Sequence, residues 1–148
     1  MYSIEEFDSA KTKVLKYVLY KKRTEREIRQ KFSSVLDEDI LEDVIEHLKE
    51  IGYISDQNYI ERAINEFLAL KNMSLKEMRY KLLAKGLSND IIDEYISSHI
   101  DELMEYEIQS AKNIYIKKQN LMKPDEVRQF LLKKGYMSDS IKEALEEG

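Results

Sequence analysis

The sequence predicts an all-α protein: three tandem three-helix repeats that form an elongated, curved superhelical rod. A helix-start pattern recurs at Thr24, Ser74 and Lys123, a period of about 50 residues. Charged residues make up 36% of the chain, whereas there are only four glycines and one proline. Such a composition favours long helices, because a β fold needs more turn residues. Apolar residues recur at helical spacing throughout.

The central hairpin shows the pattern most clearly. Ser74 followed three residues later by Glu77 is a capping box, in which each side chain satisfies a free backbone amide at the start of a helix. Gly86 supplies the left-handed residue that ends this helix, and Ser88 can cap a second one. Neither short amphipathic helix can bury its apolar side alone, so we expect the hairpin to pack against its neighbours.

The first and third hairpins repeat this pattern. Thr24 and Glu27 form the capping box of the first. In the third, Lys123 occupies the capping position, a proline follows it at the first helical position, and Gly135 ends the helix. The three hairpin helices therefore have equivalent starts.

The remaining elements follow from the same signals. We expect Met1–Asp8 to be a loosely docked arm, followed by a helix over about 9–22 and, after the first hairpin helix, another over about 39–51 that Gly52 ends. Tyr53 belongs to the turn that follows. The predicted division is an arm at 1–9 and repeats at 10–55, 56–100 and 101–148.

Two longer helices connect the repeats. Ser55 or Asp56 can cap the first, which leads into the central hairpin. Asp101 can cap the second, which should run to about Asn120. The third hairpin should end near Glu147.

The charge alternates in step with the repeat. Residues 11–31, 71–85 and 112–134 are strongly basic, whereas 37–50 and 90–107 are strongly acidic. One interpretation is that neighbouring helices pair their charges within the molecule. The other is that the basic helices form a stripe that binds phosphate or an acidic protein surface. The net charge of −5 argues against a generic nucleic-acid binder.

The densest basic cluster lies where the first helix meets the first hairpin. It is a candidate phosphate-binding surface, with a plain solubilising surface as the alternative. Basic residues in the later hairpins extend the candidate set. The residues predicted to contact a filament or phosphate are Lys21, Lys22, Arg23, Arg26, Arg29, Lys76, Arg79 and Arg128.

Enzymatic chemistry is the function class that the sequence favours least. The absence of cysteine excludes disulfides, thiol catalysis and thiolate metal sites. His47 and His99 are the only histidines and have no further ligands at metal-binding spacing. We therefore expect no catalytic residue, metal or cofactor. No apolar run reaches about 18 residues and no secretion signal is present, so we expect a cytoplasmic protein without a membrane segment.

Three motifs resemble the RecX family, bacterial regulatory proteins that act on the recombinase RecA. Gly52-Tyr53-Ile54-Ser55-Asp56 followed by Tyr59 is similar to a family turn motif. The others are Thr24, Glu27-Ile28 and Lys31-Phe32 in the first hairpin, and Leu82, Lys85-Gly86-Leu87 and Ile91-Ile92 in the second. Together they cover nearly the whole chain.

The resemblance implies a monomeric regulator that lies in the helical groove of the RecA filament on single-stranded DNA. There it would inhibit the RecA ATPase and strand exchange and promote filament disassembly, tempering recombination, DNA repair and the SOS response. Weak direct DNA binding is a further expected contact. One alternative is a helical repeat protein that binds DNA directly and independently of RecA, because three-helix units of this size resemble helix-turn-helix modules. Another is a helical adaptor for an unrelated protein.

Overall fold

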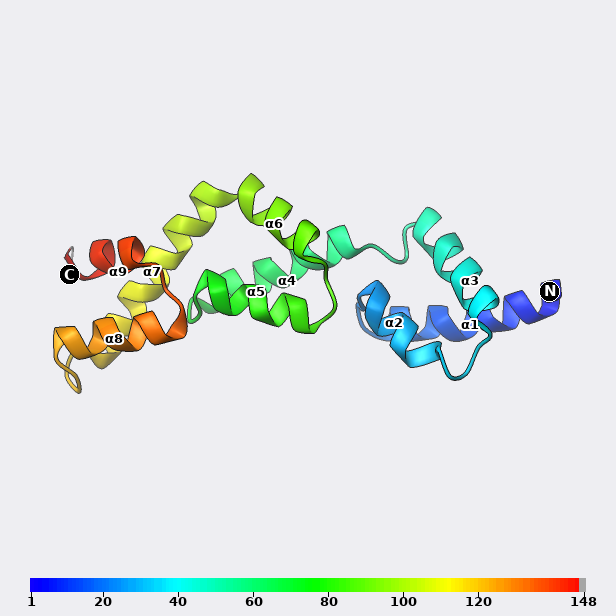
Figure 1. Ribbon diagram of the computed structural model, residues 1–148, viewed down its shortest axis with the longest axis horizontal. Coiled ribbons are helices and arrows are strands. Elements are labelled where there is room, and N and C mark those ends of the chain that lie inside the picture. The colour runs from blue at the N-terminus through cyan, green and yellow to red at the C-terminus, as the bar shows by residue number, and fades with distance from the viewer. Residues whose placement is uncertain (147–148) are drawn as a thin grey trace.

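The computed structural model describes residues 1–146, and this part of the chain folds into helices without a strand. Residues 1–146 form nine helices, which run in three successive groups of three along one axis (Figure 1). Their bounds are α1 (Ile4–Tyr20), α2 (Glu25–Phe32), α3 (Glu38–Glu50), α4 (Asp56–Leu70), α5 (Leu75–Ala84), α6 (Asn89–Ser98), α7 (Ile100–Lys118), α8 (Pro124–Lys134) and α9 (Ser138–Glu146).

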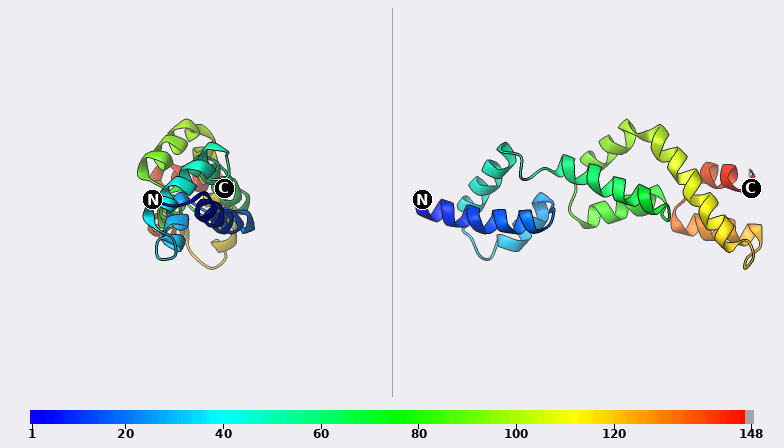
Figure 2. Two further views of the ribbon diagram at one scale, coloured as in Figure 1. Left: turned by 90° about the vertical axis from the view of Figure 1, so that its right-hand side faces the viewer. Right: turned by 180° about the vertical axis from the view of Figure 1, so that it is seen from behind.

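The three groups form a bent rod rather than one globule. The molecule is long in side view and narrow when seen along its axis (Figure 2). Each group buries its own apolar cluster, between residues 10 and 54, 60 and 106, and 108 and 144. The predicted fold class of three stacked three-helix repeats is therefore confirmed.

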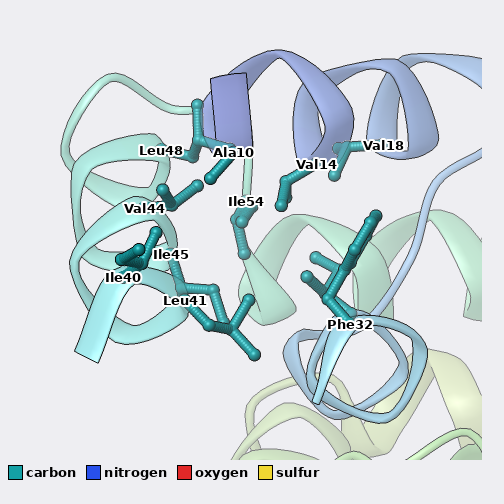
Figure 3. Close-up of a cluster of buried hydrophobic side chains, with 11 residues drawn as sticks. Ala10, Val14, Val18, Phe32, Ile40, Leu41, Val44, Ile45, Leu48 and Ile54 are labelled. Atoms are coloured by element: carbon teal, nitrogen blue, oxygen red, sulfur yellow. The ribbon is translucent and has the colours of Figure 1, made fainter. Parts of the chain in front are cut away.

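The first core shows how one repeat closes. Side chains from α1, α2 and α3 point toward a common centre, and Ile54 from the following loop joins them (Figure 3). Val14, Val44 and Leu48 have no exposed surface there. The hairpin α2–α3 thus buries its apolar side against α1, as expected for helices too short to be stable alone.

The predicted capping boxes are present. The Glu77 amide donates to the Ser74 hydroxyl oxygen at 3.1 Å, and the Ser74 amide donates to the Glu77 carboxylate at 2.9 Å. Thr24 and Glu27 make the same pair of bonds at 3.0 and 3.2 Å. The starts of α2 and α5 are therefore fixed by local chemistry that the sequence already contains.

Two predicted boundaries were wrong. Helix α1 begins at Ile4 instead of about Ser9, because Ser3 and Glu6 form a further capping box. The residues predicted to be a loose arm are therefore mostly helical, and Phe7 packs against the first core. Asp101 does not cap α7, which already begins at Ile100. The predicted end of the last helix near Glu147 lies outside the described residues.

Helix α7 belongs to two cores. Leu103 and Tyr106, in its first half, pack in the second core, whereas Ile108, Ala111 and Ile114 pack in the third. The repeat boundaries at 10–55, 56–100 and 101–148 remain a proposal about how the chain divides.

Candidate functional site

The repeats meet end to end through their hairpin helices. The Thr24 hydroxyl, at the start of α2, donates to the carbonyl of Lys85 at the end of α5, at 2.5 Å. The Ser74 hydroxyl, at the start of α5, donates in the same way to the carbonyl of Lys134 at the end of α8, at 2.7 Å. Each hydroxyl thus caps its own helix and bonds the next repeat.

Glycine permits this close approach. Gly86 and Gly135 both have a left-handed backbone, with φ of 97° and 99°. A Cβ atom on Gly86 would lie 2.6 Å from the Cβ of Arg26, and one on Gly135 would lie 2.9 Å from the Cβ of Lys76. Only glycine fits at these two positions without displacing the neighbouring helix start.

A carboxylate completes each junction. Asp56, in the first turn of α4, accepts a hydrogen bond at 3.0 Å from the amide of Glu25 in α2. Glu107 of α7 accepts from the amides of Leu75 and Met137, each at 2.9 Å, and is fully buried. Burial raises the pKa of the Asp56 carboxyl, and the hydrogen bond from the Glu25 amide opposes this shift.

Glu107 was missed by the sequence reasoning, which treated it as one acid in a charged run. Its offset of about 50 residues from Asp56 is the signal that could have identified it. Asp56, which the sequence offered as a cap, is not one, because Ser55 accepts from the Asn58 amide at 3.1 Å.

Most of the predicted basic residues are engaged within the molecule. The aliphatic stems of Arg26 and Lys76 cover the glycines of the following repeats. Arg29 pairs with Glu42 and Glu25, Arg79 with Asp93 and Asn89, and Arg128 with Asp125. Charge pairing between hairpin helices therefore accounts for Arg29 and Arg79, and hydrogen bonding to Arg29 lowers the pKa of Glu42.

The other three predicted residues, Lys21, Lys22 and Arg23, connect α1 to α2 and face α4. Two adjoining hollows of about 310 and 210 Å³ lie there, which we call the junction groove. Lys22, Tyr59 and Arg62 line both hollows. The groove is bounded by Tyr20, Lys21, Lys22, Arg23, Gly52, Tyr53, Ser55, Asn58, Tyr59, Arg62, Ala63 and Glu66.

The junction groove combines cations with aromatic rings. Tyr20 is 86% exposed at its mouth, and the Arg23 guanidinium lies 4.2 Å from the centre of the Tyr17 ring beside it. Arg62 was missed by the sequence reasoning, because Glu61 and Glu66 lie close to it in the sequence and only the folded structure brings it to the hollow that Lys22 lines. Glu66 is the one carboxylate in the lining, 4.0 Å from Arg62.

The histidines occupy packing positions. His47 meets the ring of Phe7 edge-on, and His99 stacks on Tyr95 at 4.0 Å between ring centres. Across residues 1–146, no cluster of three His, Asp or Glu side chains is placed to hold a metal ion. Within the same range, every helix is too short or too polar to span a lipid bilayer.

Known proteins resemble this chain in sequence and in fold. A regulatory protein RecX from Clostridium botulinum (strain Eklund 17B) is 34% identical over 135 residues, which cover 84% of this chain and 61% of that protein. One from Finegoldia magna is 30% identical, covering 95% of this chain and 72% of its own. The crystal structure of RecX from Lactobacillus salivarius matches 98% of this chain and 97% of its own with a TM-score of 0.82 at 23% identity.

The share of each relative's length that the chain covers differs from one relative to another. The chain spans 61% and 51% of the RecX proteins from C. botulinum and Staphylococcus carnosus. No family model matches the chain. The identity to the F. magna protein extends over most of both proteins. The chain therefore belongs to the RecX family of regulatory proteins.

Proposed function

We propose that this protein regulates RecA by binding RecA and its filament on single-stranded DNA, in the helical groove of the filament. Bound there, it inhibits the ATPase and strand exchange and promotes filament disassembly, which modulates recombination and DNA repair. Membership in the RecX family is the observation that carries this proposal. We further propose that it acts in the cytoplasm as a monomer and without a cofactor.

The shape of the molecule supplies a physical route. Three small cores in a row give a long, narrow body (Figure 1), and such a body can contact several subunits of a polymer along one groove. Once one part of the molecule has bound a subunit, the effective concentration of the other parts near the neighbouring subunits rises. This supports a filament as the partner over a single globular protein.

The decisive experiment titrates the protein into RecA assembled on single-stranded DNA while ATP hydrolysis is followed. We expect hydrolysis to fall as the protein is added, and electron microscopy of the same samples to show shorter filaments. Unchanged hydrolysis at protein concentrations well above that of RecA would reject the proposal.

A charge variant tests where the filament contact lies. Neutralising Arg26 or Arg29 would disturb a repeat junction or an ion pair, so Lys21 and Lys22 give a cleaner test. We expect K21Q/K22Q to weaken inhibition, with an unchanged circular dichroism spectrum. K117Q/K133Q makes the same charge change at exposed positions in the third repeat and should leave inhibition unchanged.

Direct DNA binding without RecA is the second candidate, and the cations and exposed tyrosine of the junction groove favour it. It predicts that the protein binds a naked oligonucleotide tightly and that RecA adds nothing to this affinity. Naked-DNA binding measured beside the ATPase titration separates the two functions.

A further inference from the structure

We infer that the junction groove binds single-stranded nucleic acid and that the bound strand clamps the first repeat to the second. The strand's phosphates would lie against Lys21, Lys22 and Arg62, and a base would stack on Tyr20. The biological meaning of this clamp rests on the proposed role on RecA filaments. The binding itself does not need RecA.

The lining has the chemistry that single strands need. Lys21, Lys22, Arg23 and Arg62 bring four cations to one short groove, against the single carboxylate of Glu66. The ring of Tyr20, which is 86% exposed, offers a stacking surface beside them. Cations that follow the backbone together with aromatic rings that stack bases are the general means by which proteins hold unpaired strands.

The size and position of the groove favour an unpaired strand over a duplex. Taken together, its two adjoining hollows, of about 310 and 210 Å³, are at the scale of a small-molecule site and can admit a splayed nucleotide. A duplex keeps its bases stacked inside, so it could not use the Tyr20 ring. An acidic peptide would match the charge but would leave this aromatic surface without a planar partner.

The two walls of the groove belong to different repeats. Tyr20 ends α1 in the first repeat and Lys21 and Lys22 follow it, whereas Tyr59 and Arg62 lie on α4 in the second. The chain crosses between the two cores as the loop at 51–55, visible between α3 and α4 in Figure 1. A ligand that contacts both walls therefore stabilises the relative orientation of the repeats seen here.

Binding is tested with the protein and a short fluorescent oligothymidylate, without RecA. Fluorescence anisotropy should give an affinity that falls with salt with a log–log slope of about −2, as expected for three phosphate contacts on a single strand. K21Q/K22Q/R62Q should bind at least about tenfold more weakly, because the variant removes those contacts. Y20A should bind the oligonucleotide roughly tenfold more weakly, because it removes base stacking and no charge.

A matched control carries the same charge change elsewhere. K117Q/K133Q/K142Q neutralises three exposed lysines of the third repeat, and its affinity should stay within about twofold of the unmodified protein. Equal loss in both triple variants would show that net charge alone drives binding, which would overturn the groove as the site. Absence of oligonucleotide binding would overturn it as well, and capture of a polyglutamate peptide in its place would assign the groove to an acidic protein segment.

The clamp is tested by the distance between repeats. Because the chain has no cysteine, S34C and S97C place one dye on the first repeat and one on the second. In single-molecule measurements, the distribution of energy-transfer efficiencies between the two dyes should narrow to one population when the oligonucleotide binds. In K21Q/K22Q/R62Q this distribution should not narrow. Binding without any change in the distribution would overturn the clamp. Failure of RecA inhibition with intact clamping would instead reject only the proposed function.

Discussion

The two repeat junctions contain equivalent residues, but the carboxylate of the second is more deeply buried and accepts more hydrogen bonds than that of the first. At the second junction, the fully buried Glu107 accepts from two backbone amides, and α7 passes without a break from the second core into the third. At the first junction, Asp56 accepts from one amide and stays partly exposed, and the chain crosses in a loop beside the junction groove.

Further polar contacts lie at the second junction. The Tyr106 hydroxyl donates to the carbonyl of Met73 at 2.8 Å, and the Ser110 and Tyr136 hydroxyls lie 2.6 Å apart. These groups are buried, so losing one partner leaves another unsatisfied. The same capping motif is thus supported by more buried polar contacts at the second junction than at the first.

The largest expected effect is at Glu107. In E107Q, one carboxylate oxygen becomes an NH₂ group facing a backbone amide, so a buried donor loses its acceptor. We expect the free energy of unfolding to fall by about 3 kcal/mol, measured by urea denaturation. E102Q makes the same change at an exposed position on α7 and should cost less than about 0.5 kcal/mol. If the two variants were equally stable, Glu107 would not hold the junction.

The next largest loss of stability is expected when the left-handed glycines are replaced by alanine. An alanine at any left-handed position costs about 1–2 kcal/mol in backbone strain. G52A meets open space and should cost only this, whereas G86A also pushes against Arg26 and should cost roughly twice as much. Thermal unfolding of both variants checks the order. Equal costs would mean that the first junction yields to the added methyl group.

The capping hydroxyls should have a smaller effect. An alanine in S74A can neither accept from the Glu77 amide nor donate to the carbonyl of Lys134. We expect a loss of about 2 kcal/mol in the free energy of unfolding, and S74T should restore it because the hydroxyl returns. T24A should lose a similar amount at the first junction. Stability of S74A equal to that of S74T would rule out the Ser74 hydroxyl as a stabilising contact.

The smallest effect belongs to Asp56 and depends on pH. Burial raises the pKa of this carboxyl above its ordinary value of 3.8, so the folded protein protonates before the unfolded chain does as pH falls. Asp56 therefore lowers stability as pH rises from the unfolded-state pKa through the folded-state pKa.

The variant D56N removes the ionisation of this side chain and keeps its hydrogen bond, because its amide oxygen still accepts from the Glu25 amide. D56N should gain stability relative to the unmodified protein as pH rises through that window, measured by urea unfolding at several pH values. D139N, at an exposed position on α9, should show no such trend. If the difference in the free energy of unfolding between D56N and the unmodified protein did not change with pH, the raised pKa of Asp56 would be contradicted.

Local chemistry explains why much of the fold was predictable. The capping box at Ser74 and Glu77 and the left-handed Gly86 act within a few residues, so the sequence by itself determined where the hairpins begin and end. The same rule applied to Ser3 and Glu6 would have found the true start of α1.

The tertiary structure alone decided how these local units are used. Nothing near Thr24 in the sequence shows that its hydroxyl bonds a carbonyl 61 residues away, or that Arg62 stands opposite Lys22. A periodic sequence specifies equivalent units because propensity and capping are short-range. Which donor meets which acceptor between units depends on how the apolar faces pack, and that is fixed only when all three cores have formed.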